Sequence, residues 1–137
     1  MSDNPNLDLL KSAFATWDES KGAVSPWLDL FDDEVCICSM DETSAGLSFA
    51  EDRRSKEQAV GYFDSLLRDW QMVHWTPETY VCDGDKIAVF GRCGWTYKAT
   101  GKTAEIRAAH LWQFRDGKVI QVTEVFDSGR AAAAATP

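Results

Sequence analysis

Two ionisable side chains near the end of the chain, His110 and Glu124, are the residues best suited to acid–base chemistry. Both occur in runs of hydrophobic, β-favouring residues, where a carboxyl group loses hydration and its pKa rises towards neutrality. Such a carboxylate can remove a proton next to a carbonyl group, and an imidazole beside it can polarise the carbonyl or return the proton. The pattern predicts proton transfer on a hydrophobic, carbonyl-bearing small molecule, with no cofactor required.

The stretch 103–127 must position both residues, and its Asp116-Gly117 pair is typical of a tight antiparallel hairpin. Two registers are open to it. A two-residue turn at Asp116-Gly117 mixes apolar and polar groups on each face. A turn at Arg115-Asp116, with Gly117 as a bulge residue, separates them, as a sheet with one buried side requires. We favour this second register.

In the favoured register His110 faces Val122, and Glu124 lies diagonally from His110, within side-chain reach. They are the only ionisable groups on the predicted inner face, which contains Ile106, Ala108, His110, Trp112, Phe114, Ile120, Val122, Glu124 and Phe126. Two interpretations of the pair remain open. It is either catalytic, or a structural pair whose members satisfy each other inside a core, because buried polar groups need partners.

The preceding strand, about 86–98, extends this inner face. A two-residue turn at Thr100-Gly101 places Gly91 opposite His110 and leaves space beside the imidazole. The alternative register turns Arg92 inwards, which is costly because a buried arginine needs a partner. His74 lies in an earlier strand whose faces cannot be assigned, and we interpret it as a surface or rim residue.

Aromatic residues are frequent enough to line a pocket, since the chain contains six tryptophans and seven phenylalanines. Apolar stripes are more often plain core than binding site. The candidates for contact with a flat hydrophobic ligand are Trp17, Trp27, Phe31, Phe63, Trp95, Tyr97 and Trp112.

Length and charge narrow the possible partners. A chain of 137 residues is long enough for one domain with a hydrophobic core. Its net charge of -8 argues against nucleic acid and anionic membrane surfaces as partners. The N-terminal residues lack a basic leader with an apolar core, so we expect a cytoplasmic location. The four cysteines lack the spacing of zinc ligands, and no metal site is expected.

Capping signals predict three helices ahead of the strands. Asn4-Pro5 and Ser25-Pro26 each combine a cap with a proline in the first turn, and Ser55 with Gln58 forms a capping box. The first strand is expected over 35–40, the polar segment 41–54 is left unassigned, and the tail 128–137 is either flexible or a short helical extension. This order predicts an α+β fold with helices packed on one face of a curved sheet.

Several short pieces of the chain occur in the order found in a known superfamily. They are LFDDEV before the first strand, SKEQAVGYF at the third helix, and FRDGKV followed by EVFD. The chain resembles the nuclear transport factor 2-like proteins, and within them the SnoaL-like and ketosteroid-isomerase-like proteins. The resemblance implies a cystatin-like, cone-shaped single domain over 1–137, in which a strongly bent antiparallel sheet wraps around N-terminal helices. It also implies a homodimer formed through the outer face of the sheet.

The superfamily hosts isomerases, cyclases, dehydratases, epoxide hydrolases and binding modules, so the resemblance must be carried over residue by residue. The position of the catalytic base in ketosteroid isomerases falls on Ser39, which disfavours steroid isomerisation. The Arg-x-Asp pair of limonene epoxide hydrolases falls near 92–94, where the acid is missing, which disfavours epoxide hydrolysis. SnoaL-like polyketide cyclases resemble this chain best, with Glu124 and His110 at their acid and histidine positions. The resemblance implies a cofactor-independent isomerase, cyclase or lyase; the alternative is a non-catalytic ligand-binding or dimerisation module.

Overall fold

The computed structural model describes residues 4–40, 47 and 51–137 of the chain. The elements follow in the order α1 (Pro5–Ser20), α2 (Ser25–Leu30), β1 (Phe31–Ser39), α3 (Lys56–Asp69), β2 (Trp70–Asp83), β3 (Lys86–Tyr97), β4 (Thr103–Arg115), β5 (Lys118–Phe126) and α4 (Ser128–Ala135). The predicted α+β class is confirmed. Of the unassigned segment 41–54, residues 41–46 and 48–50 lie outside the described residues.

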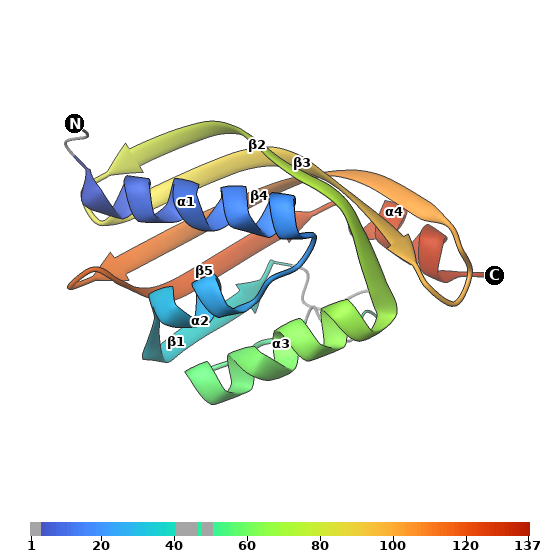
Figure 1. The fold of residues 1–137 in the computed structure, drawn as a ribbon, viewed down its shortest axis with the longest axis horizontal. Helices are drawn as coiled ribbons and strands as arrows, with labels where there is room; N and C mark the ends of the chain where they lie inside the picture. Colours follow the sequence, from blue (N-terminus) through green and yellow to red (C-terminus); the bar gives the residue numbers. More distant parts are fainter. Residues whose placement is uncertain (1–3, 41–46, 48–50) are drawn as a thin grey trace.

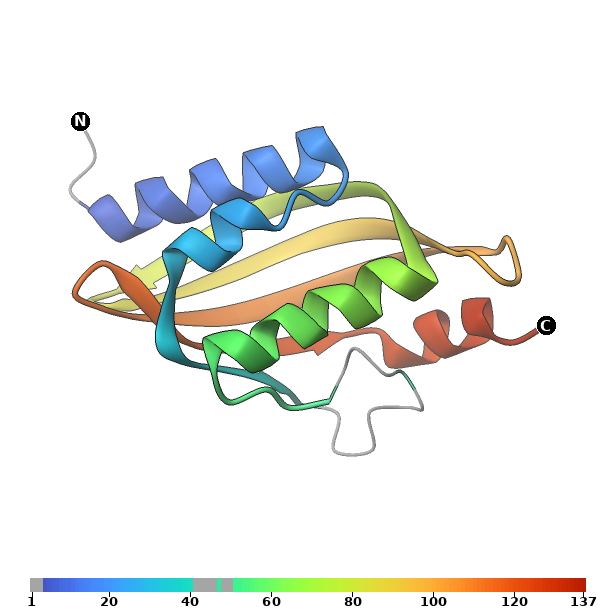
Figure 2. The same cartoon turned by 60° about the horizontal axis from the view of Figure 1, so that its bottom comes forward.

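The five strands form one curved, unclosed sheet in the order β1-β5-β4-β3-β2. Strands β2 to β5 pair antiparallel, whereas β1 pairs parallel with β5. The sheet is therefore mixed rather than wholly antiparallel, because β1 occupies the edge left free by the last hairpin and is not itself part of a hairpin. Helices α1, α2 and α3 lie on the same side of this sheet (Figures 1 and 2).

Helices α1 and α3 begin where the capping residues predict. The Asn4 side chain accepts a hydrogen bond from the Leu7 amide at 3.2 Å, and the Ser55 hydroxyl accepts one from the Gln58 amide at 3.0 Å. The cap of α2 is Val24 rather than Ser25, and no side-chain hydrogen bond caps that helix. The buried faces of α1 and α3 pack on the sheet and consist of Leu10, Ala13, Phe14, Trp17, Ala59, Phe63 and Leu66.

The tail forms helix α4. Of the two predicted alternatives, a flexible tail and a short helical extension, the helical one is therefore correct. Asp127 caps it by accepting a hydrogen bond from the Arg130 amide at 3.0 Å. Ala131 and Ala134 are buried, so the small side chains that lacked an apolar anchor in the sequence pack closely instead. The Thr100 hydroxyl donates to the Ala134 carbonyl at 2.6 Å and ties the end of α4 to the β3–β4 loop.

The turn of the β4–β5 hairpin corrects the favoured register. Asp116 and Gly117 both have positive φ, at 53° and 77°, and Arg115 pairs with Lys118. This is a two-residue turn of the kind whose twist matches that of the flanking strands. The predicted turn at Arg115-Asp116 is wrong.

A bulge in β5 restores the inner face that the favoured register predicted. The register shifts so that Ile120 is the extra residue, and Val119, not Ile120, is buried against the core. Beyond the bulge Val122 and Glu124 face inwards as expected. The consequence is that Glu124 pairs directly with His110, instead of lying diagonally from it.

The β3–β4 register also differs from the prediction. Val89 lies opposite His110, and Gly91 lies opposite Ala108, because the connecting loop is two residues longer than the predicted turn. A shift of two residues preserves the inner face, so Cys93 and Trp95 are buried as expected. A Cβ on Gly91 would lie 2.6 Å from the Thr76 carbonyl oxygen. This glycine therefore permits the close approach of β2 and makes no space beside the histidine.

Candidate functional site

Glu124, in β5, is a buried carboxyl group with only 6% of its surface exposed. Its Oε2 accepts a hydrogen bond from the Tyr62 hydroxyl of α3 at 3.1 Å. Burial raises the pKa of Glu124 to about 7, and the Tyr62 hydrogen bond partly offsets this by favouring the ionised form. Near neutral pH the carboxyl group can therefore either take or give a proton.

His110, in β4, lies among aromatic rings. Its ring stacks on Phe14 with a centroid distance of 6.1 Å and lies 5.3 Å from Trp75, while Trp112 approaches it edge-on. Nδ1 is buried and has no hydrogen-bond partner in the described part of the chain. Burial lowers the pKa of His110 to about 4, so the imidazole is neutral at physiological pH.

The two groups do not satisfy each other as a structural pair would. Glu124 accepts its hydrogen bond from Tyr62, and His110 leaves Nδ1 unpaired, although the two residues are direct cross-strand partners. Burial has reversed the usual order of their pKa values, so the carboxyl group, and not the imidazole, holds a proton near neutrality. Two titratable groups whose pKa values are driven apart by their surroundings are typical of acid–base sites, and a buried polar atom without a partner requires an explanation.

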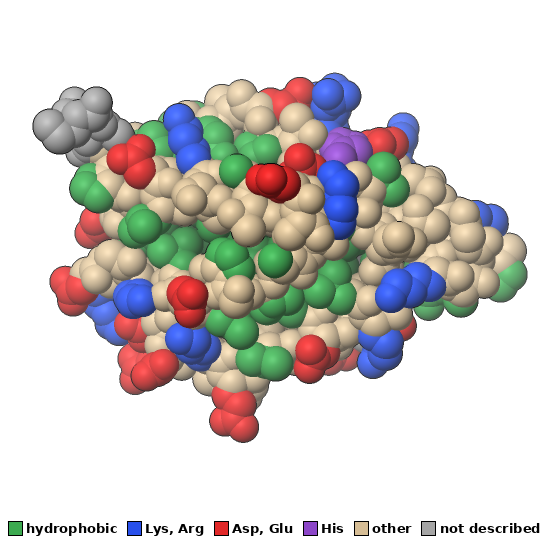
Figure 3. Space-filling view, viewed as in Figure 1, with side chains coloured by type: hydrophobic (Ala, Val, Ile, Leu, Met, Phe, Trp, Pro, Cys, Tyr) green, Lys and Arg blue, Asp and Glu red, His purple; other side chains and the backbone are tan. Residues whose placement is uncertain are grey.

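A partly open cavity of about 90 Å³ adjoins both groups, between the sheet and the helices. It is lined by Glu124, His110 and Tyr62, and by six of the aromatic residues predicted to contact a ligand: Trp17, Trp27, Phe31, Phe63, Trp95 and Trp112. On this side of the molecule hydrophobic side chains reach the surface between α1 and the other helices, with charged side chains around them (Figure 3). The site is an apolar chamber with few polar groups.

Tyr97 does not belong to this lining. It is the last residue of β3, and its ring packs edge-on against Trp70 at a centroid distance of 4.9 Å. The alternation along β3 correctly places it on the inner face, but this end of the strand extends beyond the chamber. The sequence prediction of Tyr97 as a ligand contact is therefore not supported by its position.

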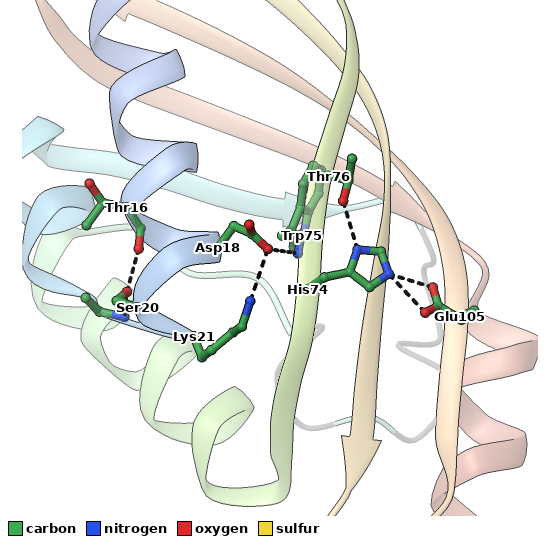
Figure 4. Close-up of polar contacts among 9 residues, drawn as sticks. Thr16, Asp18, Ser20, Lys21, His74, Trp75, Thr76 and Glu105 are labelled. Carbon is green, nitrogen blue, oxygen red and sulfur yellow. Dashed lines mark hydrogen bonds and ion pairs between the residues drawn. The ribbon is translucent and has the colours of Figure 1, made fainter.

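Two residues near the catalytic candidates were missed. Tyr62 lies three residues after Ala59 and four before Leu66, on the buried stripe of α3. A tyrosine hydroxyl on a buried stripe needs a hydrogen-bond partner, so this spacing could have identified Tyr62 as a candidate site residue. Trp75 could not be assigned because the bulges in β2 break the alternation of its faces. Its amide donates to the Asp18 carboxylate at 2.8 Å, which ties β2 to α1 (Figure 4).

His74 and Arg92 lie on the outer face of the sheet, as the surface interpretation predicted. The His74 ring is hydrogen-bonded to Thr76 Oγ1 at 2.9 Å and to the Glu105 carboxylate at 2.8 Å (Figure 4). Arg92 forms an ion pair with Glu78 at 3.3 Å. The described residues contain no cluster of histidine, cysteine and acidic side chains that could hold a metal ion, and none of their helices is long and apolar enough to cross a membrane.

Comparison with known proteins gives a family and a fold. Residues 11–122 match the model of the SnoaL-like domain. No curated protein sequence matches the chain. A nuclear transport factor 2-like protein of unknown function from Burkholderia pseudomallei K96243 is 17% identical over 100% of both chains, with a TM-score of 0.86.

Two further solved structures share this fold. TerC, co-crystallised with polyporic acid, is 18% identical over 96% of this chain and 98% of its own, with a TM-score of 0.82. A putative SnoaL-like polyketide cyclase from Mesorhizobium loti is 16% identical over 86% of this chain and 96% of its own, with a TM-score of 0.71. At such identities the similarity establishes the fold alone.

Proposed function

Because this chain belongs to the family of SnoaL-like domains, we propose that it binds a small hydrophobic, carbonyl-bearing molecule in the aromatic chamber and catalyses cofactor-independent proton transfer on it. Glu124 is the general base. The observation that carries the proposal is the burial of this carboxyl group in the wall of an apolar chamber, with a neutral phenol as its hydrogen-bond partner. The chemistry belongs to the isomerase, cyclase or lyase type.

The reaction follows from the two protonation states. Ionised Glu124 takes a proton from the carbon next to the carbonyl, and the electron pair of that bond moves to the carbonyl oxygen. Neutral His110 donates a hydrogen bond to the resulting enolate oxygen. The imidazole stays neutral throughout this step. The protonated carboxyl group then returns the proton to the same or another carbon. Tyr62 orients the carboxyl group through its hydroxyl.

The size of the chamber limits the ligand. An engineered apolar cavity of about 150 Å³ holds benzene, and the chamber here is smaller, at about 90 Å³. A ligand larger than a few heavy atoms must therefore displace some of the lining rings. This supports a second candidate function, in which the chain is a binding module whose chamber is largely filled by its own tryptophans.

Cyclohexanone is a suitable first probe, because its exchangeable protons flank a carbonyl on an apolar ring. It is larger than benzene, so its entry requires some of the lining rings to move. In deuterated water the protein should accelerate the incorporation of deuterium at these carbons. Mass spectrometry measures the rate of incorporation. Glu124→Gln removes the base and should abolish the acceleration. Glu57→Gln, the same change at an exposed position in the first turn of α3, is the matched control and should leave the exchange rate unchanged.

Three results discriminate between the candidates. Loss of exchange in Glu124→Gln alone supports the catalytic proposal. Unchanged exchange in Glu124→Gln would remove Glu124 from the mechanism. Saturable binding of cyclohexanone without exchange in any variant would favour the binding module.

A further inference from the structure

A second hollow lies on the outer face of the sheet and shares one lining residue, Ile106, with the aromatic chamber. Its volume is about 390 Å³, and it is lined by Arg92, Glu105, Ile106, Arg107, Asp127 and Arg130. Three guanidinium groups thus meet two carboxylates. This local excess of positive charge contrasts with the net charge of -8 for the whole chain.

Three separate elements bring the arginines together. Arg92 of β3 and Arg107 of β4 are direct cross-strand partners, an arrangement of like charges that destabilises a sheet. Arg130 comes from the first turn of α4, and its Nη1 donates to the Glu105 carbonyl oxygen at 3.2 Å. The fold therefore accepts an unfavourable charge arrangement at this place.

The nearby carboxylates leave one guanidinium without a counter-charge. Arg92 pairs with Glu78, and Arg130 pairs with Asp127, each at 3.3 Å. In the part of the chain that the structure describes, Arg107 has neither a hydrogen-bond nor an ion-pair partner for its side chain. It is exposed at the hollow and open to an external anion.

Glu105 could neutralise Arg107, but its carboxylate is held elsewhere. It accepts from His74 across the intervening strand β3, at 2.8 Å (Figure 4). Gly94 of β3 makes this possible, because a Cβ there would lie 2.8 Å from Glu105 Oε1 and 3.0 Å from the His74 ring. The glycine keeps the Glu105 carboxylate beside the histidine.

We propose that the hollow binds a small oxyanion, a phosphate or carboxylate group, with Arg107 as its principal ligand and Arg92 and Arg130 beside it. A guanidinium group presents a planar fork of N–H donors that matches two oxygens of such an anion. The binding of an anion relieves the repulsion between Arg92 and Arg107. This site is independent of the proton transfer proposed for the aromatic chamber.

Titration with inorganic phosphate and, separately, with succinate at constant ionic strength tests the proposal. Binding is measured by calorimetry and by shifts of the arginine side-chain NMR signals. The wild-type protein should bind at least one probe saturably, and the tighter probe identifies phosphate or carboxylate as the ligand class. Arg107→Gln should weaken binding about tenfold or more, because it removes a charge-assisted pair of hydrogen bonds.

Two further variants separate specific binding from general attraction. Arg115→Gln removes the same charge at the opposite end of β4, where Arg115 contacts Asp32 and Glu34, and should leave the affinity unchanged. Arg107→Lys keeps the charge without the fork and should bind with intermediate affinity. Equal weakening by Arg107→Gln and Arg115→Gln, or the absence of saturable binding of either probe by the folded wild-type protein, would overturn the proposal.

Discussion

Between about pH 4.5 and 6.5, burial gives Glu124 and His110 protonation states opposite to those they have in water. The pKa of Glu124 rises to about 7 and that of His110 falls to about 4, in each case because the charged form loses its hydration. The carboxyl group is therefore the titrating group near neutral pH, and the imidazole stays a neutral hydrogen-bonding group. Each pKa shift also couples folding to pH, in opposite directions.

The pH dependence of stability should reveal this opposition. The folded pKa of Glu124 lies above its ordinary value of 4.5, so its contribution to stability is lost as pH rises from about 4.5 to 7. The folded pKa of His110 lies below 6.5, so its contribution is gained as pH rises from about 4 to 6.5. In the wild-type protein the two effects largely cancel. In Glu124→Gln the free energy of unfolding should rise by on the order of 1–3 kcal/mol between pH 4.5 and 6.5.

Urea unfolding at these two pH values measures the difference, with Glu57→Gln as the control for removing an acidic group. A Glu124→Gln variant whose stability changes with pH no more than that of the wild type would contradict the assigned burial of the carboxyl group.

Tyr62 should control the pKa of Glu124. Its hydroxyl lowers the pKa of Glu124 by stabilising the carboxylate, so Tyr62→Phe should raise that pKa. The rate of cyclohexanone exchange should rise with pH as Glu124 ionises, around pH 7 in the wild type and at higher pH in Tyr62→Phe. The pH–rate profiles of both proteins check this, with Tyr80→Phe in β2 as the matched control. Superimposable profiles would show that Tyr62 is merely structural.

At the scale of elements, helix starts were predictable and strand registers were not. The caps of α1 and α3 involve neighbouring residues, so Asn4 and Ser55 identify them without knowledge of the fold. The bulge in β5 falls where Val119 and Ile120 adjoin, and because both suit a buried position the alternation cannot decide between them. His110 and Glu124 were nevertheless predicted to face inwards together, since the bulge compensates for the error in the turn.

Two long-range features of the site left weak traces in the sequence. The hydrogen bond from Tyr62 to Glu124 joins residues far apart in the chain, and spacing along α3 gives only the buried face of the tyrosine. Helix α4 contains small residues whose burial depends on close contact with the sheet, and their pattern resembles that of a flexible tail. Both features depend on how elements pack, which local patterns do not encode.

Helix α4 should depend on its tether to the β3–β4 loop. Thr100→Val keeps the shape of the side chain and removes the hydroxyl that donates to the Ala134 carbonyl. The free energy of unfolding should fall by about 1 kcal/mol, since a part-buried carbonyl loses its partner. Urea denaturation measures the change, and Thr79→Val at an exposed position in β2 is the control. Equal stabilities of the two variants would show that the tether contributes nothing.

At the scale of the whole molecule, the bent sheet separates two surfaces with different chemistry. The inner face and helices enclose the aromatic chamber, while the outer face presents the arginine hollow together with exposed hydrophobic residues. Phe90 and Val125 are each 50% exposed, and both pair with Ala109 in the middle of the outer face. Exposed apolar groups gathered on one face are typical of a protein interface.

The homodimer that the family resemblance implies is therefore expected to form through the part of this face around Phe90 and Val125, beside the arginine hollow. Native mass spectrometry of the wild-type protein should show a dimer, and Phe90→Asp should shift it to monomer by placing a charge in the apolar contact. Val60→Asp, on the exposed side of α3, is the control and should leave the dimer intact. A wild-type monomer, or a dimer unaffected by Phe90→Asp, would rule out this interface.

The most direct test of the account is an NMR titration of the glutamate carboxyl carbons, in which Glu124→Gln identifies the signal of Glu124. Burial in the aromatic chamber predicts that this carboxyl group titrates with a pKa of about 7, well above the ordinary value of 4.5. A signal that titrates near the ordinary value of 4.5 would contradict the central claim, because a carboxyl group with that pKa is solvated and lacks the strengthened basicity assigned to it.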